Sequence, residues 1–110
     1  MYRRNFLMMT ASAAVLTPLA VRKARAATTH KVKIRGFRFS PRELEVRVGD
    51  TIEFENRDST PHTATANNQG WDTGALDFGG KENVQVTADM DAGYFCRFHP
   101  GMKGKLKISA

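Results

Sequence analysis

The chain has 110 residues, of which 41% are hydrophobic and 25% charged, so it supports one small domain and excludes a multi-domain enzyme. A net charge of +6 first suggests a nucleic-acid or anionic-membrane partner, but five of the 17 basic residues lie in the first 26 residues, which contain no acid. The other 84 residues carry twelve basic and eleven acidic side chains, a balance that predicts no nucleic-acid partner.

Residues 1–26 are typical of an export signal. Arg3 and Arg4 precede a weakly apolar stretch, and an Ala-x-Ala cleavage pattern ends at Ala26. The stretch is shorter than the roughly 20 apolar residues that span a bilayer, which favours a cleaved signal over a membrane anchor. The two arginines with the following Asn-Phe-Leu resemble the twin-arginine export signal. We therefore predict a periplasmic mature protein, residues 27–110, without stable membrane insertion.

Apolar and polar residues alternate along the mature region, which is the period of β-strands. The alternation predicts strands that contain Val32 and Ile34, Phe37 and Phe39, Leu44 to Val48, Ile52 and Phe54, Val84 to Val86, Tyr94 to Cys96, and Leu106 to Ile108. Such short strands between Gly, Pro and Asn turns indicate an all-β fold, an antiparallel sandwich or barrel.

Several aromatic residues are predicted to pack inside this fold. By alternation, the core should contain Phe37, Phe39, Phe54 and Tyr94. The Gly-rich connection over residues 67–80 should contribute packing anchors over one end of the sandwich, Trp71 and Phe78.

Cys96 is the one cysteine, so it cannot form an internal disulfide in an exported chain. Its role has three explanations: burial as a small hydrophobe, intermolecular pairing, or metal ligation. His99 and Met102 follow at three-residue intervals, and Pro100 and Gly101 are predicted to form a tight loop between them. This spacing of a thiol, an imidazole and a thioether favours metal ligation.

His62 is the natural fourth ligand, because it follows a proline, which fixes the local backbone, at the start of a predicted strand. His30 lies near the predicted cleavage site and is expected to be solvated. Together His62, Cys96 and His99, with Met102 as a weak axial ligand, form the trigonal set of blue-copper electron-transfer sites. Zinc is the alternative metal, although Met is a poor zinc ligand.

These residues resemble those of type 1 copper proteins of the plastocyanin/azurin (cupredoxin) family, and within it those of the amicyanins. The resemblance covers the whole mature region and is strongest in Val48-Gly49-Asp50-Thr51-Ile52-x-Phe54-x-Asn56, Pro61-His62 and Tyr94-x-Cys96-x-x-His99-Pro100-x-Met102-x-Gly104. The two-residue gaps on both sides of His99 match the short ligand loop of amicyanins. The resemblance implies a Greek-key sandwich of two sheets, one copper ion under the loops at one end, and His99 close to the surface.

The implied function is that of a soluble, monomeric one-electron carrier. The implied partners are redox proteins such as a c-type cytochrome and a dehydrogenase or reductase. They would dock near Phe98, His99 and Pro100. A copper storage or delivery protein is the alternative, but a thiolate site binds copper too firmly for fast release. No enzymatic role is predicted, because copper enzymes need a second centre with more histidines than this chain has, and its aspartates show no catalytic pairing.

Three residues depart from the family pattern. Family members tend to have Asn after the first His ligand, where this chain has Thr63, and Thr or Ser followed by Pro after the Cys ligand, where it has Arg97 and Phe98. A Thr hydroxyl can brace the Cys-bearing loop as an amide does. The positive charge of Arg97 should favour reduced copper, unless solvent screens it.

Overall fold

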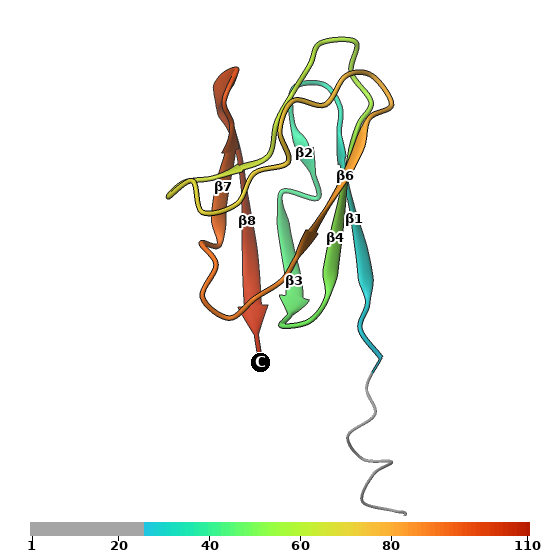
Figure 1. Ribbon diagram of the computed structural model, residues 1–110. Coiled ribbons are helices and arrows are strands. Elements are labelled where there is room, and N and C mark those ends of the chain that lie inside the picture. The colour runs from blue at the N-terminus through green and yellow to red at the C-terminus, as the bar shows by residue number, and fades with distance from the viewer. Residues whose placement is uncertain (1–25) are drawn as a thin grey trace, which may run out of the picture.

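The computed structural model describes residues 26–110, which form eight strands and no helix (Figure 1). The strands are β1 (Thr29–Ile34), β2 (Phe39–Ser40), β3 (Glu43–Arg47), β4 (Thr51–Asn56), β5 (Thr65–Ala66), β6 (Lys81–Gln85), β7 (Gly93–Cys96) and β8 (His99–Ser109). The all-β prediction is confirmed, while the predicted signal peptide lies outside the described residues. No helix of the described part is long and apolar enough to cross a membrane.

Residues 26–110 build two four-stranded sheets, with strand orders β2-β1-β4-β6 and β3-β8-β7-β5. The chain crosses from the first sheet to the second between β2 and β3, and returns to the first at β4. This double crossing makes β1 and β4 parallel, as are β3 and β8, while the other pairs are antiparallel. The antiparallel pairing expected from the sequence is confirmed for four of the six strand pairs and wrong for two, because alternation reports which face is buried and says nothing about strand direction.

The core lies between the two sheets and is centred on aromatic rings. Phe39, Phe54 and Tyr94 are buried as predicted and meet edge to face, with ring centroids 4.8 to 6.4 Å apart. Trp71 stacks on Phe54 at 6.1 Å from the connection over residues 67–80, which confirms its packing role.

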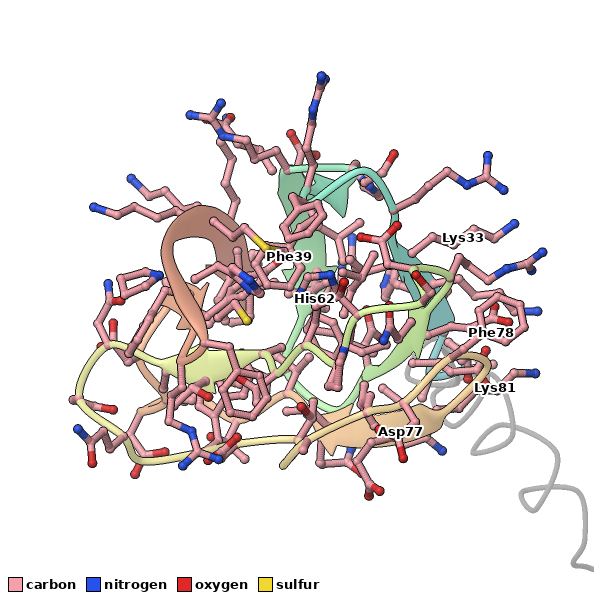
Figure 2. All side chains as sticks on the ribbon, turned by 90° about the horizontal axis from the view of Figure 1, so that it is seen from above. Lys33, Phe39, His62, Asp77, Phe78 and Lys81 are labelled. Atoms are coloured by element: carbon pink, nitrogen blue, oxygen red, sulfur yellow. The ribbon has the colours of Figure 1, made fainter. Side chains whose placement is uncertain are left out.

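Two of the predicted packing residues are exposed. Phe37 is 48% exposed and Phe78 is 67% exposed, so the predictions for both are wrong. Phe37 falls in the turn between β1 and β2 with a φ of 60°, which breaks the alternation that Phe39 obeys. In Figure 2 the ring of Phe78 points away from His62 at the margin of the molecule.

The β7–β8 hairpin reaches one end of the sandwich together with the β1–β2 turn, and the C-terminus lies at the opposite end (Figure 1). The hairpin turn consists of Arg97 and Phe98, and Cys96 pairs with His99 across it. The register then shifts, so that residues 100–102 of β8 have no partners opposite. The predicted tight loop at Pro100 and Gly101 is wrong, because these residues already belong to β8.

Candidate metal centre

Three potential metal-ligating atoms converge at the hairpin end of the sandwich. The side chains of His62, Cys96 and His99 place their donor atoms within 4.8 Å of one another. The Cys96 Sγ atom lies 3.7 Å from His62 Nδ1 and 3.8 Å from His99 Nδ1. His62 and Cys96 are fully buried and His99 is half-buried. His62 lies near the centre of the molecule in the end view of Figure 2. The structure thus brings together three of the four predicted ligands. His62 comes from the connection between β4 and β5, and Cys96 and His99 flank the turn of the β7–β8 hairpin.

The remaining predicted ligand, Met102, is buried within the same core cluster as Cys96. It lies in the unpaired stretch of β8 created by the register shift after His99. His30 lies elsewhere, at the opposite end of β1, where its Nε2 atom is 2.9 Å from the carboxylate of the buried Asp50. The expectation that His30 is solvated is therefore wrong, and its exclusion from the ligand group agrees with the structure.

A carboxylate fixes the orientation of the His62 ring. The Nε2 atom of His62 lies 2.8 Å from Oδ2 of Asp58. Because an ionised carboxylate can only accept hydrogen bonds, Nε2 carries the proton and donates it to Asp58. The lone pair is then on Nδ1, the atom that faces the Cys96 sulfur. The ring is therefore held in the tautomer that a metal requires.

Asp58 also organises the turn between β1 and β2. Its two oxygens accept hydrogen bonds from the backbone amides of Gly36 and Phe37, at 2.8 and 2.9 Å. Burial by itself raises the pKa of Asp58, but these bonds and the one from His62 outweigh it and hold the pKa below its ordinary value. Asp58 thus stays ionised and keeps Gly36 and Phe37 in their left-handed conformations.

The ring of Phe37 covers the two histidines as a result. It meets His62 edge to face at 5.1 Å and His99 at 4.9 Å between ring centroids. The two imidazoles are themselves 5.1 Å apart. An apolar lid formed by Phe37 therefore limits solvent at the half-buried histidine, which strengthens electrostatic interactions beneath it.

The sulfur of Cys96 accepts a hydrogen bond from the backbone amide of Thr63 at 3.3 Å. This contact connects the residue after His62 with the base of the β7–β8 hairpin. The amide holds the sulfur in place, and a metal-bound sulfur could accept the same hydrogen bond. Cys96 is buried, so pairing with a cysteine of another molecule would require the hairpin end to open.

A second connection runs from Thr63 to Arg97. The backbone amide of Arg97 donates a hydrogen bond to Thr63 Oγ1 at 2.9 Å. The Oγ1 atom of Thr65 lies 2.9 Å from Thr63 Oγ1 and donates its proton to Asp72. Since each hydroxyl has one proton, Thr63 donates to Thr65. The Arg97 guanidinium completes this closed chain of contacts, because it lies 3.1 Å from the Asp72 carboxylate. The bracing expected of Thr63 is present, and the charged group of Arg97 forms an exposed ion pair with Asp72.

Two residues at the centre were missed by sequence reasoning. Asp58 was one of several scattered aspartates without a catalytic pairing, and Phe37 was assigned to the core. A signal existed for Asp58, because it lies four residues before His62 within a tight connection. None existed for Phe37, because its position depends on backbone amides that bind a carboxylate 21 residues away.

The comparisons with known proteins agree with this geometry. A family model described as a cupredoxin-like domain matches residues 6–108. The fold is similar to that of a Cu(I) form of an amicyanin variant, with 26% identity and a TM-score of 0.66 over 79% of this chain and 88% of that one. An oxidised amicyanin variant gives 27% identity and a TM-score of 0.66 over 74% and 82%.

A copper-containing nitrite reductase from Thermus scotoductus is also similar, with 27% identity and a TM-score of 0.65 over 74% of this chain. The matched part is only 22% of that enzyme. No curated protein sequence matched the chain. The family model spans most of the chain, and the sequences of these three structural neighbours are 26% to 27% identical to it. The chain is therefore a member of the cupredoxin-like family.

Proposed function

We propose that the protein is a one-electron carrier that holds one type 1 copper ion with His62, Cys96 and His99, and with Met102 as a weak axial ligand. The observation that supports this most is the convergence of one buried sulfur and two imidazole nitrogens within 4.8 Å. A thiolate and a thioether suit Cu(I), whereas imidazoles suit Cu(II). When bound, copper would supply the Cu(II)/Cu(I) couple.

The protein residues would hold both oxidation states with little rearrangement. Asp58 fixes His62, the Thr63 amide fixes the sulfur, and Phe37 packs against both imidazoles. A donor set held in place by neighbouring groups changes little when an electron moves, which favours rapid transfer. The full burial of Cys96 opposes fast metal release, and this favours a carrier over a copper storage or delivery protein.

Electrons would leave through the half-buried His99. The hairpin turn beside it exposes Phe98, which is 51% exposed, and Pro100 is exposed as well. We expect redox proteins such as a c-type cytochrome and a dehydrogenase or reductase to meet this apolar patch in small, transient encounters. Substituting Phe98→Glu should slow electron exchange and leave the visible spectrum unchanged, whereas unaltered rates would exclude the patch.

No separate enzymatic activity is proposed for this chain. A second copper centre would need further histidines, and the one remaining, His30, is paired with Asp50. The similarity to a nitrite reductase extends over 22% of that enzyme and supports a shared copper-binding domain.

The proposed place of work is the periplasm, after removal of residues 1–26. Intact mass of the periplasmic protein should show Ala27 as the first residue. Replacing Arg3 and Arg4 together by Lys should trap the precursor in the cytoplasm if export uses the twin-arginine route. A full-length, membrane-retained chain would instead indicate an anchor.

Reconstitution with metal tests the central proposal. Copper should bind one ion per chain and give an intense visible charge-transfer band from the Cys96 thiolate. Cys96→Ser should abolish the band, because a hydroxyl is barely ionised and is a harder donor. His30→Gln is the control and should retain the band. Preferential uptake of zinc, or a colourless copper complex, would overturn the assignment, and rapid copper loss to a chelator would support storage or delivery.

A further inference from the structure

The charges of the mature region nearly balance, but they are unevenly distributed along the chain. Residues 31–42 contain five basic and no acidic residues, and residues 97–107 contain four basic and no acidic residues. Residues 67–92, by contrast, contain five acidic residues and one basic residue, Lys81. Folding places the β1–β2 turn beside the β7–β8 hairpin and thereby brings the two basic segments together at the candidate metal centre.

Three adjoining surface hollows line this region, and Arg42 borders all of them. We call their five exposed cationic residues the basic flank: Arg35, Arg38, Arg42, Lys103 and Lys105. Glu43 is the one acidic residue that lines these hollows in the described part of the chain, and it lies 3.6 Å from Lys107.

The cations of the basic flank form no ion pair within the part of the chain that the structure describes. Among residues 26–110, the ion pairs formed by Lys and Arg are Arg57 with Glu55, Arg97 with Asp72, and Lys107 with Glu43. None involves the flank. Five positive charges, with Glu43 as the one carboxylate among them and with Arg97 paired to Asp72 nearby, produce a one-sided positive potential at this end of the molecule.

The basic flank borders the proposed copper site directly. The middle hollow is lined by Arg38, Arg42 and Lys103 together with Phe37 and Met102. Phe37 contacts the rings of both histidine ligands, and Met102 is the proposed axial ligand. Only the side chain of Phe37 or Met102 would therefore separate a molecule that covers this hollow from the proposed copper site.

We propose that the basic flank is the docking surface for an acidic redox protein, whose carboxylates pair with Arg38, Arg42 and Lys103 while its redox group faces Phe37 and His99. This inference rests on the proposed electron-carrier function and adds the charge of the partner to it. Opposite charges steer the encounter and orient the partner, while the apolar patch provides close contact. A concave surface that combines cations with an aromatic lid over the metal suits such a protein better than a phosphate polymer or a flat membrane.

The first test uses the triple variant Arg38→Glu, Arg42→Glu and Lys103→Glu, and each of its three single variants is compared with Lys81→Glu, which changes the net charge by the same amount. Lys81 begins β6, at the edge of its sheet opposite β2, and is also exposed. Electron exchange of the copper-loaded proteins with an acidic c-type cytochrome would be followed by stopped flow at several salt concentrations. The triple variant should react at least about tenfold more slowly at low salt and lose the salt dependence. Lys81→Glu should stay within about twofold of the unmodified protein.

The second test does not need copper. Amide chemical shifts of the metal-free protein would be recorded while the same acidic cytochrome is added. Shifts should be confined to the basic flank and the residues around Phe37, and Gln substitutions at the three positions should weaken them. This readout separates the two proposals, because docking can be observed even if the visible band of the copper protein fails to appear.

Three outcomes would overturn the inference. The first is equal rates for the triple variant and Lys81→Glu in proteins with intact visible bands. The second is faster exchange with a basic cytochrome than with the acidic one. The third combines two results: the metal-free protein binds phosphatidylglycerol vesicles but the triple variant does not, and the acidic cytochrome causes no amide chemical-shift changes. These results would make the flank a membrane-binding surface.

Discussion

The backbone amide of Arg97 donates a hydrogen bond to the side-chain oxygen of Thr63 at 2.9 Å. Each residue directly follows a proposed copper ligand, so this bond joins the His62 connection to the hairpin turn after Cys96. The Thr63 amide strengthens the link by donating to the Cys96 sulfur. Thr63 thus braces the hairpin, with its hydroxyl as acceptor and its backbone amide as donor.

Replacing Thr63 by Val should lower the free energy of unfolding by about 1 to 3 kcal/mol, because the Arg97 amide and Thr65 would lose a partner in a buried region. Thr63→Ser retains the hydroxyl and is the matched control, with a loss below about 1 kcal/mol. Denaturant unfolding of the metal-free proteins measures both values. Equal stability of the Val and Ser variants would show that the bond contributes nothing.

Asp58→Asn should weaken copper binding by about 10-fold to 100-fold, because the amide is a poorer acceptor for His62 and for the turn amides. The reduction potential should rise as well, since loss of a negative charge beside a ligand favours Cu(I). Competition with a chelator and voltammetry measure the two effects. The control is Asp77→Asn, an exposed carboxylate elsewhere in the chain, which should change neither. An unchanged affinity in Asp58→Asn would mean that the His62 ring is held by packing alone.

Met102→Leu should retain copper and colour while raising the reduction potential, because a trigonal site without an axial donor favours Cu(I). Met102→Gln should lower the potential, since an amide oxygen is a harder donor that stabilises Cu(II). Voltammetry of the two variants decides the matter. If both potentials equal that of the unmodified protein, Met102 is a packing residue.

Tyr94 predicts how stability depends on alkaline pH. Burial raises the pKa of its phenol far above the ordinary value of 10.0, and among residues 26–110 its hydroxyl has no hydrogen-bond partner. Because the folded-state pKa is the higher one, the contribution of Tyr94 to stability is complete below pH 10 and decreases as pH rises above it. Unfolding measured between pH 8 and about 12 should show this decrease, and Tyr94→Phe should lack it. A variant with the same alkaline slope would assign the decrease to other groups.

Gly104→Ala should destabilise the protein by about 1 to 3 kcal/mol, because the added Cβ would overlap the ring of Tyr94. Gly101→Ala is the matched control, since a Cβ there meets no atom within 4 Å. Thermal unfolding of the two metal-free variants compares them directly. Comparable melting temperatures would show that the Tyr94 ring moves aside without cost.

The sequence by itself determined most of the strands, although not β5, and the choice of proposed metal ligands, because both depend on local spacing. Alternation of period two fixes which side chains of a strand share a face, as Ile52 and Phe54 do. Residues three apart at a hairpin turn cannot be far from each other in space, so Cys96 and His99 would meet in any hairpin that paired them. His62 lies in the connection between β4 and β5. It meets Cys96 and His99 because this connection and the β7–β8 hairpin reach the same end of the sandwich.

Only the tertiary structure decided which residues surround the ligands and where the charges gather. Asp58 binds the amides of Gly36 and Phe37 across more than 20 residues, and this long-range contact turns a predicted core aromatic into a lid. The parallel pairs β1–β4 and β3–β8 depend on the path of the chain between sheets, which alternation does not record. The same path places two basic segments side by side, so a nearly balanced composition becomes a polarised surface. Contacts between distant segments depend on how strands are ordered, and that order is decided by the packing of the whole core.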